Sequence, residues 1–290
     1  MGFKADFKTA LERHIPTSQL HFKSGWDRES WYRSSWAGND GRPVALLLHH
    51  TAAAATASTN PNNAGNQHGA NNGQVQFVWR HPQYDMPCSQ FALDRDGCLF
   101  VNAYKPVYHA GQGSFAGTKW SSLGVVKDRG NDFMLGVECI DKGLDTTFTE
   151  AMKVTLARLA VAMKEACRWP STDTLYLPRH KDYAGPRKVD IKYSNATVQD
   201  WVARWGGSMW DGTTPKIDGL FNAMNDPTLA NPACFRLAAR LKDLGFFTGT
   251  PVDGEQKYPV KAVKDWQRAN GYATNPAGAY SPAVHTGIFG

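Results

Sequence analysis

The spacing of apolar residues predicts strands that are buried in the interior of a mixed fold. Residues 44–50 (VALLLHH) form a continuous apolar run after a Gly-Arg-Pro sequence, which is typical of a central buried strand. Residues 89–103 (SQFALDRDGCLFVNA) predict a hairpin, because two strand-like runs flank the Asp96-Gly97 turn. Residues 131–141 (NDFMLGVECID) indicate a further buried strand.

Helical spacing separates these strands. The strongest pattern covers residues 147–169, where apolar positions recur three and four residues apart and Thr147 with Glu150 fits a capping box. Shorter helices are predicted at residues 3–14, 75–82 and 197–205. Because helices alternate with strands, we expect an α/β fold with a mixed central β-sheet flanked by helices.

Changes in composition divide the chain into four parts. Residues 1–43 are Trp-rich and are interpreted as an N-terminal extension that packs on a main domain at 44–205. Within that domain, the Asn/Gly-rich residues 58–74 predict a mobile loop. Residues 206–219 are rich in Gly, Thr and Pro and predict a linker. Residues 220–290 repeat an amphipathic segment that ends in Gly and an aromatic residue, and predict a second, small three-helix domain.

Composition narrows the classes of protein. The longest apolar runs are too short to span a bilayer, and the first residues lack the apolar core of an export signal. The five cysteines show no metal-knuckle spacing, which argues against a disulfide scaffold and for a reducing compartment. A net charge of +6 favours anionic partners, but it is spread thinly, so we expect neither nucleic acid nor a membrane as partner. We expect a monomer.

Several polar residues stand where chemistry, rather than packing, explains them. A carboxylate within the apolar run FMLGVECI is costly to bury without a cation or a metal. A loop at 177–190, bent by Gly185-Pro186, can bring its two ends together. The candidates are His49 or His50, His109, Glu138, His180, Lys188 and Asp190. Two imidazoles and one carboxylate form a common catalytic zinc shell with an open position, and zinc lowers the pKa of bound water from about 15.7 towards about 7.

Each candidate also has a structural interpretation. A single histidine at a strand end is more often a satisfied structural residue than a ligand, and His49 and His50 point to opposite faces. By itself, His109 could cap a loop, and Asp190 could cap a turn. Lys188 could be a solvated charge, and Glu138 could belong to an ion pair.

Four motifs together resemble a known family. LLLHHTA, VYHAG, NDFMLGVE and HKDYAGPRKVD occur in the order seen in type-2 N-acetylmuramoyl-L-alanine amidases, whose fold is shared with peptidoglycan-recognition proteins and many phage endolysins. The resemblance implies that residues 44–205 are a zinc amidase domain. It implies Zn²⁺ bound by His49, His180 and Asp190, with Glu138 activating water, Lys188 stabilising the transition state and His109 lining the substrate groove.

The resemblance has one departure and one extension. Many members carry a tyrosine at the start of the hairpin, where this chain has Ser89-Gln90, so Glu138 would carry more of the proton transfer. Near the C-terminus, RLKDLGFF, VDG and AVKDWQRANGY resemble the small peptidoglycan-binding domain of wall hydrolases, although Val260 replaces a hydroxyl residue. Such a module would raise the local substrate concentration.

The expected activity is hydrolysis of the amide bond between N-acetylmuramic acid and L-alanine in bacterial peptidoglycan. Without an export signal, the expected role is a phage endolysin made in the host cytoplasm and acting on the cell wall at lysis. Three alternatives remain: a non-catalytic peptidoglycan-binding protein of the same fold, a zinc peptidase that cuts within the stem peptide, and a nucleic-acid binder suggested only by the basic charge.

Overall fold

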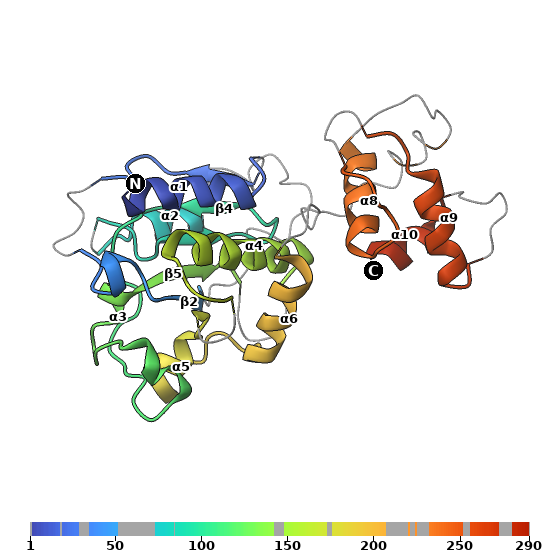
Figure 1. Ribbon diagram of the computed structural model, residues 1–290. Helices are drawn as coiled ribbons and strands as arrows, with labels where there is room; N and C mark the ends of the chain where they lie inside the picture. Colours follow the sequence, from blue (N-terminus) through green and yellow to red (C-terminus); the bar gives the residue numbers. More distant parts are fainter. Residues whose placement is uncertain are drawn as a thin grey trace. The chain divides into compact units, whose positions relative to one another are not determined.

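Two compact units, Met1–Gly207 and Ser208–Gly290, make up the chain (Figure 1). The computed structural model describes residues 2–17, 19–28, 35–51, 73–83, 85–141, 148–172, 176–206, 220, 224, 232–251, 256–272 and 280–289. Most of the predicted loop at 58–74 lies outside these residues, and so does the predicted linker at 206–219 beyond Gly206.

The first unit is built on a mixed sheet with the strand order β1-β4-β3-β5-β2. The strands are β1 (Leu20–Phe22), β2 (Ala45–His50), β3 (Phe91–Leu93), β4 (Leu99–Val101) and β5 (Met134–Cys139). β2 and β3 run parallel to β5, and β1 runs parallel to β4, whereas β3 and β4 form an antiparallel hairpin. The predicted mixed sheet is therefore confirmed, and so is the hairpin, whose turn holds Gly97 at a φ of 81°.

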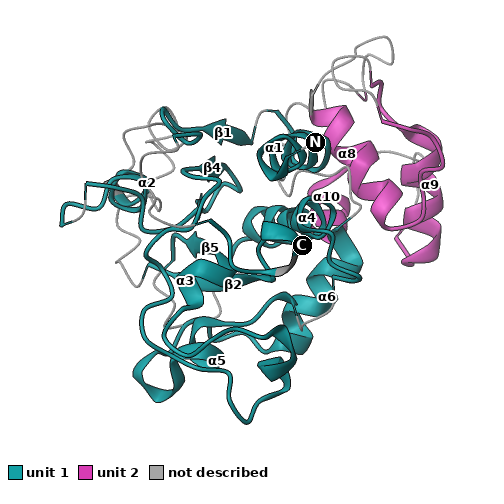
Figure 2. Cartoon of the chain, turned by 60° about the vertical axis from the view of Figure 1, so that its left-hand side comes forward, with its two compact units in different colours: residues 1–207 teal, residues 208–290 magenta. Residues whose placement is uncertain are grey.

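The strand predicted as central at 44–50 is β2, which instead stands last in the strand order. It is still buried along its whole length, because residues 178–179 lie along its outer edge, where the Leu48 amide donates to the Pro178 carbonyl. Helices cover both faces of this sheet. They are α1 (Phe3–His14), α2 (Gly73–Trp79), α3 (Gly130–Phe133), α4 (Glu150–Cys167), α5 (His180–Ala184) and α6 (Asn195–Trp205). Short 3-10 turns are η1 (Asn39–Gly41), η3 (Lys119–Leu123) and η5 (Gly185–Arg187). Helices α1, α4 and α6 follow one another along one side of the sheet (Figure 2).

Three predicted boundaries needed correction. The helix predicted at 75–82 begins two residues earlier and ends at Trp79. The strand predicted at 131–141 starts only at Met134, because the residues before it form the helical turn α3. The proposed cap of the long helix was wrong: Thr149 is the N-cap, and its side chain accepts a hydrogen bond from the Met152 amide.

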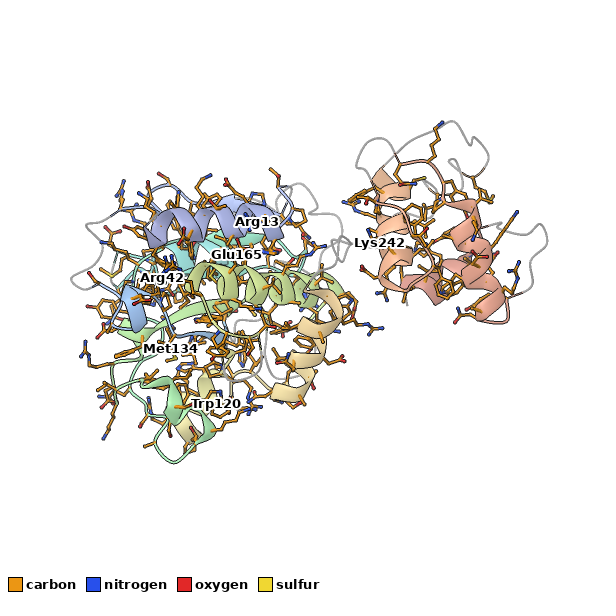
Figure 3. The ribbon with its side chains drawn as sticks, viewed as in Figure 1. Arg13, Arg42, Trp120, Met134, Glu165 and Lys242 are labelled. Atoms are coloured by element: carbon orange, nitrogen blue, oxygen red, sulfur yellow. The ribbon has the colours of Figure 1, made fainter. Side chains whose placement is uncertain are left out.

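The first 43 residues contribute to the body of the first unit. Helix α1 packs along α4, and an ion pair between Arg13 and Glu165 joins the two helices on their outer side (Figure 3). The Phe7 ring stacks on Phe91 of β3 with ring centroids 5.6 Å apart. Strand β1 also comes from this segment and adds an edge to the sheet beside β4.

The second unit contains three described helices, α8 (Pro232–Asp243), α9 (Val260–Ala269) and α10 (Pro282–Phe289). Helix α8 contacts both α9 and α10, and Arg240 donates a hydrogen bond to the Ile288 carbonyl. Gly287 allows Trp266 to approach α10, since a Cβ at that position would lie 2.4 Å from a ring carbon of the tryptophan. The small helical domain predicted near the C-terminus is confirmed as a fold. No helix in the described parts of the chain is long and apolar enough to cross a membrane.

One buried acid in the hairpin makes the stability of the first unit depend on pH. Asp94 is 2% exposed, and its Oδ1 accepts hydrogen bonds from the Asp96 and Cys98 amides. Burial raises the pKa of Asp94 to about 7, although the Cys98 amide opposes this shift. Because the folded pKa lies above the unfolded value of about 3.9, folding favours the protonated acid, and that contribution is lost as pH rises from about 4 to about 7.

Asp94→Asn keeps the acceptor oxygen and removes the charge. We expect the variant to have a higher Tm than the wild type at pH 8, because its free energy of unfolding rises by roughly 2 to 4 kcal/mol, and to have nearly the same Tm near pH 4. Thermal unfolding of the wild type and the variant across this range measures the difference. Asp96→Asn, which changes the net charge equally in the same turn, should have a smaller effect in the same direction, because the Asp96 charge also raises the pKa of Asp94. A Tm difference that does not vary with pH would contradict the argument.

Candidate metal centre

Strand register places the first two site residues side by side. His49 on β2 is the register partner of Glu138 on β5, near the carboxyl ends of two parallel strands. His49 therefore shares a sheet face with Leu47 and Ala45, and His50 has the opposite orientation beside Cys139. Of the two neighbouring histidines, His49 is the one that joins the cluster described below.

The loop of residues 177–190 brings the other two residues to the same place. Arg179 and Asp182 form a double hydrogen bond that fixes the first turn of α5, where His180 lies. The chain then turns at Gly185, with a φ of 62°, and returns so that the Lys181 amide donates to the Asp190 carbonyl at 2.8 Å. Asp190 therefore lies next to His180.

Three potential ligand atoms converge on one point. His49 Nδ1 lies 2.9 Å from His180 Nδ1, and Asp190 Oδ2 lies 2.9 Å from His180 Nδ1 and 3.7 Å from His49 Nδ1. All three residues are buried, and each offers one ligand atom within 4.8 Å of the others. Four ligands at Zn²⁺ bond lengths lie ~3.3–3.6 Å apart in a tetrahedron. The donor types and their separations therefore fit zinc.

The protonation states of His49 and Asp190 also suit the binding of a cation. Burial, followed by the neighbouring His180, lowers the pKa of His49 to about 4, so its ring is neutral and can offer a lone pair. Burial alone would raise the pKa of Asp190, but the close approach of the His180 and His49 imidazoles to its carboxylate outweighs burial and holds that pKa well below its usual range. Asp190 is therefore a carboxylate, as a metal ligand must be.

Glu138 lies next to these atoms but is not one of the three. Its Oε1 is 3.9 Å from His49 Nδ1, and its Oε2 has no hydrogen-bond partner among the described residues. Burial, with the Asp190 charge adding to it, raises the pKa of Glu138 to about 8, while Lys188 acts in the opposite direction. A carboxyl with a raised pKa and a free oxygen can both accept and return a proton near neutral pH.

A cavity of about 300 Å³ opens beside the cluster. Its walls include Glu138, Lys188 and the exposed side chains of Phe77 and Val189. Cys88 also lines it, but burial raises the pKa of the thiol to about 12, which argues against a cysteine nucleophile. The cavity therefore brings a carboxyl group, Glu138, and a cation, Lys188, next to the ligand cluster, which is an arrangement suited to hydrolysis.

His109 lies behind His49 and also borders the cavity. It is 8% exposed, and its Nδ1 is 3.1 Å from His49 Nε2. The sequence did not identify two further residues at this centre: Asn131, whose side chain accepts a hydrogen bond from the His109 amide, and Ala110, whose carbonyl contacts His180. Ala110 acts through its backbone carbonyl, which leaves no signature in the sequence.

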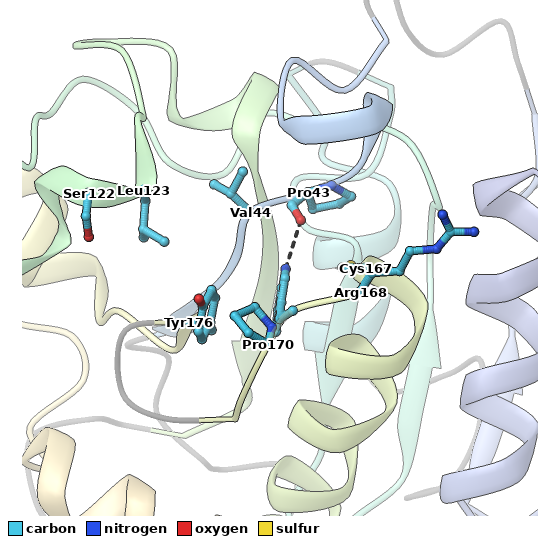
Figure 4. Close-up of a pocket in the computed structure, with 9 residues that line it drawn as sticks. Pro43, Val44, Ser122, Leu123, Cys167, Arg168, Pro170 and Tyr176 are labelled. Atoms are coloured by element: carbon cyan, nitrogen blue, oxygen red, sulfur yellow. Dashed lines mark hydrogen bonds between the residues drawn. The ribbon is translucent and has the colours of Figure 1, made fainter.

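A second cavity, of about 390 Å³, lies at the other end of β2, next to Pro43 and Val44 (Figure 4). The Trp169 indole donates a hydrogen bond to the Pro43 carbonyl, and its ring stacks on Tyr176. Among its lining residues there is no carboxylate or histidine. It therefore lacks the groups for acid–base or metal chemistry found in the first cavity.

A family model described as N-acetylmuramoyl-L-alanine amidase matches residues 39–192, more than half of the chain, and that range contains all three clustered ligands. No curated protein sequence matches the chain.

Several solved structures are similar to this chain over most of their own length. A crystal structure of an AmpD derivative is 20% identical and covers 56% of this chain and 85% of its own, with a TM-score of 0.39. The amidase endolysin LysCS from Clostridium intestinale URNW is 14% identical, with 66% and 97% coverage and a TM-score of 0.39. AmpDh3 from Pseudomonas aeruginosa is 19% identical, with 91% and 94% coverage and the same TM-score of 0.39. On the evidence of the family match and the buried ligand cluster that it contains, the chain belongs to the N-acetylmuramoyl-L-alanine amidase family.

Proposed function

We propose that this enzyme hydrolyses the amide bond between the lactyl group of N-acetylmuramic acid and the L-alanine of the stem peptide in peptidoglycan. The observation that carries the proposal is the buried cluster of His49, His180 and Asp190, of which His180 and Asp190 line a cavity together with Glu138 and Lys188. A complete ligand set argues against the alternative of a non-catalytic binding protein with the same fold.

His49, His180 and Asp190 would hold the metal. When bound there, Zn²⁺ polarises a carbonyl oxygen and acidifies a water molecule. Glu138 accepts the proton of the attacking water through its unpaired Oε2 and delivers it to the leaving amine of the alanine. Lys188, an exposed cation in the same wall, lies where negative charge develops on the carbonyl oxygen, and such a contact is worth roughly 3 to 4 kcal/mol elsewhere.

Ser89 does not take over the role of the family tyrosine. Its side chain is fully buried, its Oγ has no hydrogen-bond partner among the described residues, and it is not among the residues that line the cavity. A Cβ built on Gly136 would lie 2.9 Å from this oxygen, so Ser89 faces the strand β5. Proton transfer by Glu138 without a tyrosine is therefore part of the proposal.

Product analysis tests the proposed reaction. Purified peptidoglycan digested with the protein should yield free alanine amino termini and intact glycan strands, as shown by mass spectrometry and amino-group labelling. Cleavage inside the stem peptide would instead identify a zinc peptidase. A DNA mobility shift at moderate salt would support the nucleic-acid alternative, and we expect none.

We also propose that residues 220–290 bind the cell wall and that the protein is a phage endolysin. The sequence motifs RLKDLGFF and AVKDWQRANGY support wall binding, and they cover the C-terminal parts of α8 and α9 in the three-helix unit and the residues that follow. The protein would be made in the host cytoplasm and reach the wall at lysis. Expression in bacteria should leave cells intact until the membrane is permeabilised; lysis without permeabilisation would contradict this role.

Removing the second unit tests the wall-binding proposal directly. A chain ending at Gly207 should still cleave soluble muropeptides at the full rate, because the ligand cluster lies within the first unit. It should sediment less with insoluble wall and digest that wall roughly 10-fold or more slowly at low enzyme concentration, because tethering is lost. Equal sedimentation of the full and shortened chains would rule out the binding role.

A further inference from the structure

A short segment, His109-Ala110, lies directly behind both imidazole ligands. The His109 side chain contacts His49, and the backbone carbonyl of Ala110 contacts His180. These two contacts come from consecutive residues, although His49 and His180 are far apart in the sequence. The segment is therefore placed to control the orientation of two ligands at once.

The contact with His49 fixes the position of a proton. His109 Nε2 is 2.8 Å from the Met134 carbonyl oxygen, which can only accept, so His109 carries its proton on Nε2. The neutral His109 ring then presents a bare Nδ1, which lies 3.1 Å from His49 Nε2. His49 must donate from Nε2, and its own Nδ1 is left bare towards the ligand cluster.

The contact with His180 works in the same way. His180 Nε2 lies 3.1 Å from the Ala110 carbonyl oxygen, so the imidazole donates there. Its Nδ1, which faces His49 and Asp190, is left without a proton. Both lone pairs that a metal requires are thus set by hydrogen bonds from the far sides of the rings.

The segment is itself held in place from two sides. Asn131 Oδ1 accepts hydrogen bonds from the His109 amide at 2.9 Å and from the Ala110 amide at 2.8 Å. On the other side, Gly136 leaves room for the His109 ring, since a Cβ there would lie 2.6 Å from His109 Nδ1. The ring and the carbonyl therefore have little freedom to move away from the ligands.

We propose that His109 and Ala110, clamped by Asn131, are positioning residues that orient His49 and His180 for metal binding. This inference rests on the zinc site of the proposed function and goes beyond it, since it assigns His109 a role at the ligands rather than at the substrate. In other zinc proteins, the groups that hydrogen-bond to the second nitrogen of a zinc-bound histidine increase metal affinity by about 10- to 100-fold.

The test measures zinc affinity by competition with a chromophoric chelator, without substrate. His109→Phe keeps a ring of similar size but offers no acceptor, and it should weaken zinc binding by about 10- to 100-fold. His109→Asn places an amide oxygen near the former Nδ1 and should recover most of that loss. The absorption spectrum of the Co²⁺-substituted protein should change in the Phe variant and return towards wild type in the Asn variant.

A second pair of variants tests the clamp. Asn131→Leu removes the side-chain oxygen that accepts from both amides, leaving the His109 amide only the Val107 carbonyl, and should also weaken zinc binding. Asn131→Asp retains an acceptor oxygen and should weaken zinc binding less. Tyr108→Ala, at a 57% exposed neighbour, is the control and should bind zinc as the wild type does. Melting of each chelator-treated variant separates a loss of affinity from a loss of folding.

The outcomes distinguish this inference from the proposed function. If the wild type binds zinc and folded His109→Phe binds it with equal affinity and an unchanged Co²⁺ spectrum, the positioning role is wrong and the proposed activity is unaffected. If the wild type binds no zinc, the metal site and this inference both fail. If zinc binds as expected but the product analysis shows another cleaved bond, only the proposed substrate fails.

Discussion

Asp190→Ala is expected to leave the protein without stoichiometric zinc and to lower its turnover by about 10³-fold or more. Asp190 supplies the carboxylate oxygen of the cluster, 2.9 Å from His180 Nδ1, and the two remaining donors are imidazole nitrogens. A site with two protein ligands binds zinc far more weakly than one with three, and without the metal the water is not acidified. Metal analysis of the purified variant, together with a turnover assay, measures both effects.

The matched control for this variant is Asp132→Ala. Asp132 is a carboxylate of the same unit that is paired with Arg129 rather than with the ligand cluster, so its removal should leave zinc content and turnover close to wild type. Asp190→Asn, which preserves the shape of the side chain, should behave as Asp190→Ala does. One zinc per chain in both Asp190 variants, at wild-type affinity, would show that the metal is held elsewhere.

Glu138→Gln is expected to separate chemistry from metal binding. The variant keeps the size and polarity of the side chain but cannot accept a proton, so kcat should fall by roughly 10²- to 10⁴-fold while zinc content stays at the wild-type level. Tm should not fall, because the charge of Glu138 is already disfavoured by burial, which raises its pKa to about 8. Steady-state kinetics on a soluble muropeptide and metal analysis of the same preparation check both points.

Lys188→Met provides the comparison for Glu138→Gln. It removes a charge from the same cavity wall without removing a proton acceptor, and it should lower kcat by about 10²-fold with zinc retained. A Glu138→Gln protein that keeps more than a tenth of the wild-type kcat would exclude Glu138 as the general base. Loss of zinc from that variant would instead place Glu138 among the ligands.

The sequence was sufficient to predict the parts of the site that depend on local patterns. The apolar run at 44–50 predicted β2, and the period of two along a strand implied that only one of His49 and His50 could join the cluster. The turn at Gly185 predicted that the ends of its loop would meet, and Asp190 does lie beside His180. The resemblance supplied the choice of His49, which periodicity alone left open.

Other parts depend on contacts that no local pattern encodes. The backbone carbonyl of Ala110 and the side-chain oxygen of Asn131 accept hydrogen bonds from residues distant in the sequence, and neither residue type indicates such a contact. The strand β1 is only three residues long and is stabilised by pairing with β4, so it had no periodicity to detect. Thr147 and Thr149 both precede the long helix, and propensity alone could not separate them.

The first 43 residues matter for anyone who intends to shorten this enzyme. The family match begins at residue 39, but two earlier parts of the chain belong to the fold. Strand β1 forms the edge of the sheet beside β4, and Phe7 of α1 packs against Phe91 of β3. A protein trimmed to the matched range would present unpaired peptide groups along β4 and bare apolar surface on α4. An exposed strand edge can pair with a strand of another chain, so the first 43 residues protect the enzyme from aggregation in addition to completing its fold.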